Sequence, residues 1–180
     1  MAKKHVLVAV SGGIAVYKVA QVVSDLTKHD VDVQVIMTEN ATKFVAPLTF
    51  EALTGRVVYT DTFDYSSDAS IKHISLAQEA DVFCVAPATA NVIAKLAHGI
   101  ADDMVSSTFL AATCPVLVCP AMNVHMYENA ATQANLRTLE ERGIKLIGPG
   151  VGKLACGDVA RGTLSPVQEI VDAVMAALGD

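Results

Sequence analysis

"HVLVAVSGGIAVYKVA", residues 5–20, decides the fold. Its first part, His5–Val10, is an apolar run rich in valine that ends in Ser-Gly-Gly, and a helical pattern begins at Ile14. A short, β-branched apolar run bounded by glycines predicts a buried strand. A strand that turns through glycines directly into a helix is typical of a βαβ unit. The stretch therefore predicts a parallel sheet, with this loop at the carboxyl end of one strand.

The alternation of strand and helix continues along the whole chain. Further apolar strand patterns lie at residues 31–37, 81–88, 114–121 and 143–150. Helical patterns lie at residues 14–29, 47–54, 71–79, 90–98, 101–112 and 129–142. A last helix is predicted to begin with Ser165 as its N-cap and Pro166 at its first position. Together these patterns predict a Rossmann-like, flavodoxin-like α/β fold of three layers around a central parallel sheet, as one domain over residues 1–180.

The composition excludes several classes of protein. Of the 180 residues, 52% are apolar and 18% charged, yet no stretch approaches the about 18 uncharged apolar residues of a membrane helix. A buried parallel sheet or subunit contacts explain the apolar surplus better. The net charge is −6 and no basic run occurs, so no nucleic-acid partner is expected. The N-terminus lacks the pattern of a signal peptide, so we expect a cytoplasmic protein.

The cysteines separate into buried and accessible thiols. Cys84 and Cys119 lie within strand patterns and are expected to be small buried apolar residues. No C-x-x-C pair and no histidine cluster at zinc spacing occurs, so no metal site is expected. Cys156 differs, because it lies in the glycine-rich, polar stretch "GVGKLACGDVARG", residues 150–162. Its thiol is therefore a candidate for chemistry.

The loops at the strand ends predict a ligand crevice. Ligands of open parallel sheets bind beyond the carboxyl ends of the strands. Those ends here are rich in small and polar residues: Ser-Gly-Gly at 11–13, Thr-Glu-Asn at 38–40, "APATAN" at 86–91 and "PAMNVHM" at 120–126. Backbone N–H groups, with the hydroxyls of Ser11 and Thr38 as further donors, could hold a phosphate. "SGGIAVYK" has neither the G-x-G-x-x-G spacing nor the P-loop lysine, so a mononucleotide fits better than a dinucleotide.

Five side chains in this region have two possible roles or an uncertain orientation. Thr89 and Asn91 stand at a helix start, where capping and ligand contact are compatible. Lys95, one turn later, is expected to point to solvent. Asn123 either bonds its own backbone in a turn or fixes a ligand in an apolar wall. His73 opens a short helix and could accept a proton if it faces the crevice.

Four motifs together resemble a known family. "SGGIAVYK", "APATANVIAK", "PAMNVHMY" and "LACGD" occur in this order over nearly the whole chain. With His73, they resemble the flavin-dependent cysteine decarboxylase family. The resemblance is greatest to the branch that acts in coenzyme A biosynthesis. It implies a lyase, here in a stand-alone form, that decarboxylates 4'-phosphopantothenoyl-L-cysteine to 4'-phosphopantetheine.

The resemblance also implies the cofactor and its surroundings. The cofactor would be FMN, bound oxidised and non-covalently, which oxidises the cysteine part of the substrate to a thioaldehyde. CO₂ then leaves, and the remaining enethiolate takes back a hydride. The residues that match FMN contacts or their vicinity are Ser11, Gly13, Met37, Thr38, Glu39, Thr89, Ala90, Asn91, Val92 and Ala121.

The roles around the substrate follow from the same resemblance. His73 would be the base that aids the oxidation, Asn123 would hold the substrate carboxylate, and Cys156 would protonate the enethiolate. Three further residues match positions that flank the substrate in a closing flap: Lys153, Ala155 and Leu164. Members of the family form trimers with the site between subunits, often assembled into dodecamers. A homotrimer or homododecamer is therefore implied.

The chain departs from the family pattern at two places. The motif PXMNXXMW ends here in Tyr127 instead of Trp. After "ACGD", the usual Gly-x-Gly-Arg is replaced by Ala-Arg-Gly-Thr at 160–163, which displaces the arginine to Arg161 and puts its role in the flap in doubt.

Four other functions stay open on the sequence. An oxidative decarboxylase of a peptide's C-terminal cysteine would stop at the enethiol, and Cys156 argues against it. A flavin prenyltransferase is disfavoured by "PAMN". A non-enzymatic, flavin-binding regulatory subunit of a phosphatase would carry long acidic extensions. A plain mononucleotide-binding module would leave Asn123 and Cys156 unexplained.

Overall fold

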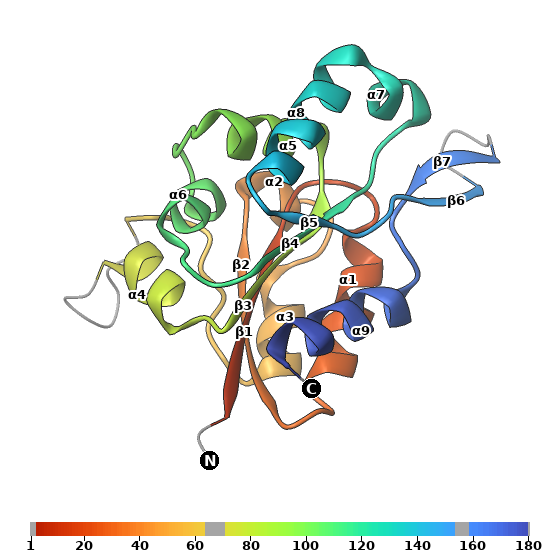
Figure 1. Cartoon of the computed structure of the whole chain (residues 1–180). Coiled ribbons are helices and arrows are strands. Elements are labelled where there is room, and N and C mark those ends of the chain that lie inside the picture. Colours follow the sequence, from red (N-terminus) through yellow and green to blue (C-terminus); the bar gives the residue numbers. More distant parts are fainter. Residues whose placement is uncertain (1–2, 64–70, 154–158, 180) are drawn as a thin grey trace.

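A five-stranded parallel sheet forms the centre of the computed structural model, which describes residues 3–63, 71–153 and 159–179 (Figure 1). Its strands are β1 (Lys4–Val10), β2 (Val31–Met37), β3 (Val82–Ala88), β4 (Val116–Pro120) and β5 (Lys145–Leu146). They lie in the order β2-β1-β3-β4-β5, and every pair is parallel. This is the flavodoxin-like strand order, so the predicted fold class is confirmed.

Helices cover both faces of the sheet (Figure 1). One face carries α1 (Val16–Leu26), α3 (Pro47–Thr54) and α9 (Val167–Leu178). The other face carries α4 (Lys72–Glu79), α5 (Ala90–His98), α6 (Met104–Ala111) and α8 (Ala130–Glu141). None of the helices within the described ranges is both long and apolar enough to cross a membrane.

Burial on both faces explains the continuous apolar strands. In β1, Val6 and Val8 pack into the cluster under α1 and α9, whereas Leu7 and Ala9 pack into the opposite cluster. Successive strand residues point to opposite faces, so a strand covered on both sides must be apolar throughout. The run quoted at 5–10 is therefore explained by its central place in the sheet.

The two strand cysteines are buried, as predicted. Cys84 and Cys119 lie on neighbouring strands with their sulfur atoms 4.0 Å apart. The adjoining Cys84 thiol and burial hold the pKa of Cys119 well above its usual value. The Cys119 thiol is therefore protonated at neutral pH, and both cysteines pack as small buried residues.

The start of the last helix was predicted one residue too early. Pro166 has an extended backbone (φ −50°, ψ 141°) and is the N-cap, so α9 begins at Val167. Ser165 is buried, and its hydroxyl has no hydrogen-bond partner among the described residues. The prediction of Ser165 as N-cap is therefore wrong.

Four short elements that the sequence patterns did not indicate lie near the carboxyl ends of the strands. α2 (Glu39–Thr42) follows β2, and α7 (Val124–Glu128) follows β4. The stretch quoted at 150–162 contains β6 (Gly150–Lys153) and the start of β7 (Val159–Thr163), which pair antiparallel in a separate hairpin. Part of the predicted flap is therefore regular structure, while Ala155 and Cys156 lie outside the described residues.

Candidate functional site

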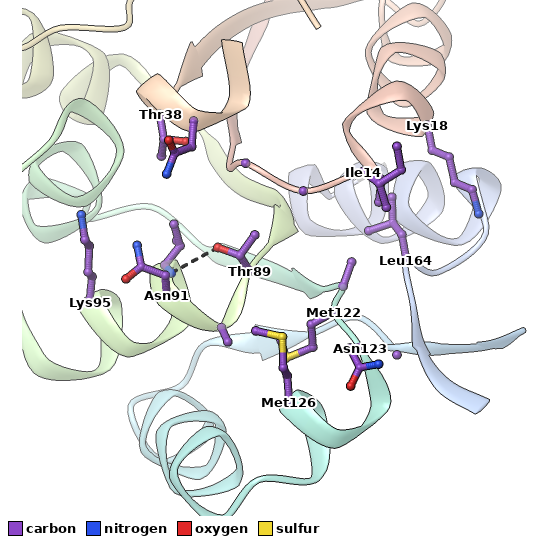
Figure 2. Close-up of a pocket in the computed structure, with 18 of the residues that line it drawn as sticks. Ile14, Lys18, Thr38, Thr89, Asn91, Lys95, Met122, Asn123, Met126 and Leu164 are labelled. Atoms are coloured by element: carbon purple, nitrogen blue, oxygen red, sulfur yellow. Dashed lines mark hydrogen bonds between the residues drawn. The ribbon is translucent and has the colours of Figure 1, made fainter. Parts of the chain in front are cut away.

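One pocket of about 1050 Å³ opens at the carboxyl ends of the strands (Figure 2). It is bordered by the β1–α1 loop, the starts of α2 and α5, the segment between β4 and α7, and the end of β7. Ten of the predicted site residues line it: Gly13, Thr38, Glu39, Thr89, Ala90, Asn91, Val92, Ala121, Asn123 and Leu164. Residues far apart in the chain thus meet at one site, where open parallel sheets bind ligands.

Ser11 supports the pocket from behind. It is fully buried, its hydroxyl donates to the Pro87 carbonyl at 2.6 Å, and its oxygen accepts the Thr89 N–H at 3.0 Å. These bonds join the end of β1 to the end of β3. The expectation that Ser11 offers its hydroxyl to a ligand is therefore not met in this arrangement. Met37 is likewise fully buried and packs in the core below the pocket.

The starts of α2 and α5 meet at one end of the pocket. Thr38 caps α2 by accepting the Ala41 N–H at 3.3 Å, and Thr89 caps α5 by accepting the Val92 N–H at 3.4 Å. The capping role of Thr89 is confirmed, and Thr89 also lines the pocket. The first N–H groups of a helix and its dipole favour an anion. This end therefore suits a phosphate.

Glycines allow the first loop to approach these helix starts. A Cβ atom on Gly12 would lie 2.5 Å from Cβ of Asn40 and 2.8 Å from its carbonyl carbon. No side chain fits there without a shift of the α2 backbone. At Gly13 the nearest atom would be Cγ2 of Thr89 at 3.5 Å, an ordinary contact. Gly12 thus permits close backbone packing, while Gly13 borders open pocket.

Lys95 was predicted to point to solvent, and this prediction is wrong. It lines the pocket next to Asn91 (Figure 2), and its side chain is only 18% exposed. Its ammonium group lies 2.6 Å from Asp102 and 2.7 Å from Asp103. Burial opposes the charged form, but the hydrogen bonds to both carboxylates outweigh it and raise the pKa of Lys95. Two acidic residues from a later segment therefore hold Lys95 against the pocket.

Asp103 has a second role at the same place. Its carboxylate caps α6 and forms a capping box with Ser106. Burial raises the pKa of Asp103, but the hydrogen bonds from Lys95 and Ser106 lower it more, so the net pKa is below the usual value. The carboxylate is therefore charged at neutral pH and couples α6 to α5.

The opposite wall of the pocket contains Asn123. Its side-chain oxygen accepts the His125 N–H at 2.9 Å and caps α7. The turn-forming role is therefore confirmed, and the same residue lines the pocket beside Met122 and Met126 (Figure 2). Leu164, from beyond β7, is buried and lines the pocket from another segment. A polar group in an apolar wall can orient a ligand.

The structure does not place four of the predicted residues in the pocket lining. His73 lies on α4 and is not among the lining residues. Its Nδ1 atom is buried without a hydrogen-bond partner from the described part of the chain. Lys153 ends β6, just before the residues that the structure does not describe. The predicted roles of His73, Lys153, Ala155 and Cys156 stay predictions.

The pocket also contains residues that the sequence patterns did not single out. These are chiefly Lys18 on α1, Asp102 and Asp103 before α6, and Gly162 and Thr163 at the end of β7. The acidic pair in "GIADDM" could have been recognised as a partner for the lysine one helix earlier. Within the described ranges, no group of three or more His, Cys, Asp or Glu side chains is placed to hold a metal ion.

Comparisons with known proteins agree with this fold. The Flavoprotein family model matches residues 1–179. The coenzyme A biosynthesis bifunctional protein CoaBC of Bacillus subtilis is 53% identical over 168 residues, which are 93% of this chain and 41% of that protein. The chain therefore spans about two fifths of the length of this curated relative.

Solved structures match the chain over their full length. A mutant of a PPC decarboxylase complexed with pantothenoylaminoethenethiol has a TM-score of 0.90 and 31% identity, covering 99% of this chain and 100% of that one. The FMN-dependent cysteine decarboxylase SpaF has a TM-score of 0.86 and 32% identity, with 99% of both chains covered.

Proposed function

Because this chain belongs to the Flavoprotein family, we propose that it is an FMN-dependent carboxy-lyase. Its reaction would be the decarboxylation of 4'-phosphopantothenoyl-L-cysteine to 4'-phosphopantetheine in coenzyme A biosynthesis. Support comes from the relative that acts in coenzyme A biosynthesis and from the PPC decarboxylase structure. The cytoplasm is the proposed location.

One observation carries the proposal: a single pocket joins a phosphate-type end to the Asn123 wall. Its volume of about 1050 Å³ lies at the top of the range of about 300–1,000 Å³ that is usual for one small ligand. A cofactor and a substrate can therefore lie in contact within it. Figure 2 shows Thr38, Asn91 and Lys95 at one end and Asn123 and Leu164 at the other.

The residues present fit FMN. Gly13 leaves open space, and the caps Thr38 and Thr89 place two helix starts beside it, where a phosphate is favourable. Ala121, from the end of β4, gives a small surface against which a flat ring can lie. When bound, FMN supplies a reversible two-electron oxidation of the cysteine part of the substrate.

Asn123 would orient the substrate. Its side-chain oxygen accepts the His125 N–H, and an amide also carries N–H donors. A polar amide beside the apolar Met122 suits a carboxylate that must leave as CO₂, because little water competes for it. Lys153 and Ala155 would flank the substrate from the hairpin, and Cys156 would donate the last proton.

We also propose self-association as a trimer, alone or within a dodecamer. His73 lies outside the pocket lining of its own chain, and Ile71 and Ile74 beside it are exposed apolar residues. A contiguous exposed apolar patch is the usual mark of a contact surface, and Ile71 and Ile74 would contribute to one beside His73. In a trimer, His73 of one subunit would act as the base at the pocket of a neighbouring subunit.

The test is incubation of the FMN-loaded protein with 4'-phosphopantothenoyl-L-cysteine, followed by mass spectrometry. The proposal expects a product that lacks CO₂ and is otherwise redox-neutral. A product two hydrogens lighter would identify an oxidative cysteine decarboxylase, and a peptide with a C-terminal cysteine is the matching alternative substrate. No loss of CO₂ from either substrate would contradict the enzyme proposal and favour a flavin-binding regulatory subunit.

The substitution Asn123→Asp tests the substrate wall. Aspartate also caps helices well, so α7 and the melting temperature should be unchanged. The donor is replaced by a negative charge facing a carboxylate, so kcat/KM should fall by about 100-fold or more. Steady-state kinetics and thermal unfolding check both parts. If the loss of kcat/KM came with a large fall in melting temperature, Asn123 would act only on folding.

A further inference from the structure

A side-chain contact links the hairpin to the helix that carries the Asn123 wall. The guanidinium carbon of Arg161 on β7 lies 5.9 Å from the centre of the Tyr127 ring on α7. Arg161 is exposed, whereas Tyr127 is half-buried and packs against the second core cluster. A guanidinium within about 6 Å of an aromatic centre makes a cation–π contact. The hairpin is thus attached to a residue that is itself well packed.

The Tyr127 end of this contact is fixed relative to Asn123. The Tyr127 N–H donates to the Asn123 carbonyl at 2.9 Å, across one turn of α7. The Gln133 amide donates to the Tyr127 carbonyl at 2.7 Å, from the next helix. A displacement of Tyr127 would therefore also displace the turn that carries Asn123.

The Arg161 end is fixed relative to the facing wall. The next residue, Gly162, accepts the Met122 N–H at 2.9 Å, and it has a φ of 145° that favours glycine. Gly162, Thr163 and Leu164 then line the pocket. The Met122–Gly162 hydrogen bond and the Arg161–Tyr127 contact therefore join the same two pocket walls, the 162–164 segment and the Asn123 turn. The two β7 residues that make them are adjacent in the chain.

We propose that Arg161 and Tyr127 are positioning residues for the substrate. Their cation–π contact holds the Gly162–Leu164 wall against the Asn123 turn and so sets substrate affinity. The two positions at which the chain departs from the family motifs are here in contact with each other, which explains how a displaced arginine can still serve the pocket. The kinetic part of this proposal rests on the proposed function.

The kinetic test compares Arg161→Gln with four other variants. The contact is exposed, so its loss should raise KM about two- to five-fold and leave kcat unchanged. Tyr127→Leu should have the same effect, and the double variant should be no worse than either single one. Arg161→Lys should restore most of the affinity. The matched control is Arg137→Gln, an exposed arginine on α8, which should leave KM unchanged.

A second readout does not depend on turnover. The chain has no tryptophan, so Tyr127→Trp introduces a single reporter at the contact. In the FMN-loaded protein, adding Arg161→Gln should raise the acrylamide quenching constant of this tryptophan about two-fold, because the guanidinium no longer covers the ring. Adding Arg137→Gln should not.

The outcomes separate the two proposals. Unchanged quenching would show that the contact does not form, and raised quenching with unchanged KM would show that it does not position the walls; either result overturns the inference. Absence of turnover by the wild-type chain would contradict the proposed function alone. The quenching comparison would then test the contact by itself, and unchanged quenching would still overturn the inference.

Discussion

Gly12 and Gly13 are adjacent in the chain but meet different surroundings. A Cβ on Gly12 would press on the backbone of Asn40, while a Cβ on Gly13 would enter the pocket beside Thr89. The two glycines therefore serve different purposes: the first permits packing between a loop and α2, and the second leaves room for a ligand. Sequence alone presents them as one Gly-Gly pair.

Alanine substitutions at the two glycines should affect two different quantities, the stability of the fold and the affinity for FMN. Gly12→Ala forces the α2 backbone to move, so it should lower the free energy of unfolding by about 1–3 kcal/mol. Gly13→Ala makes only an ordinary contact with Thr89 and should leave stability unchanged, but its methyl group should weaken FMN binding about ten-fold or more. Urea unfolding of the apoprotein and flavin fluorescence titration measure the two quantities. Equal destabilisation by both variants would contradict this division of roles.

At the scale of elements, α5 and α6 are joined by charge. Lys95 near the end of α5 reaches Asp103, which caps the start of α6. The pairing brings the start of α6 to the same end of the pocket as α5. Since Asp103 has two roles, a single substitution can remove the charge and keep the cap.

The substitution Asp103→Asn isolates the charge, because asparagine also caps helices. It should lower the free energy of unfolding at about pH 7 by roughly 1–2 kcal/mol, between the values for exposed and buried pairs. The pKa of Asp103 is depressed in the folded state, so its contribution is present above the unfolded value of 3.8 and is lost as the pH falls below it. Urea unfolding at a series of pH values should show the difference from wild type shrinking below that pH. A difference that persists there would exclude the ion pair as its cause.

At the scale of the whole molecule, the site as described does not include the predicted base. His73 lies on α4, outside the pocket lining, with exposed Ile71 and Ile74 beside it. If the proposed assembly forms, each pocket is completed by a neighbouring subunit. The active unit is then the oligomer and not the single chain.

Subunit mixing tests this arrangement. His73→Asn and Asn123→Asp subunits should each be inactive alone. After they are unfolded together and reassembled with FMN, about a quarter of the sites should combine an intact pocket with an intact His73 from the neighbour, and about a quarter of the wild-type activity should return. Light scattering gives the mass of the assembly. No recovery in a mixed trimer would show that His73 does not act across the subunit boundary.

Much of the architecture followed from local pattern. The apolar run at His5–Val10, repeated at later strands, predicted a parallel sheet, because burial on both faces demands continuous apolar residues. The strand-end loops predicted the place of the pocket, because parallel strands bring their carboxyl ends to one edge. Burial and alternation are properties of short segments, and sequence carries them directly.

Tertiary structure alone decided which distant side chains meet. Lys95 was expected in solvent and instead pairs with Asp102 and Asp103, and Arg161 lies over Tyr127 across the pocket wall. His73 lies in the helix predicted for it, but it does not line the pocket of its own chain. Such contacts depend on how loops and helices return in space, and the energy of a side-chain pair depends on a distance that the linear order of residues does not contain.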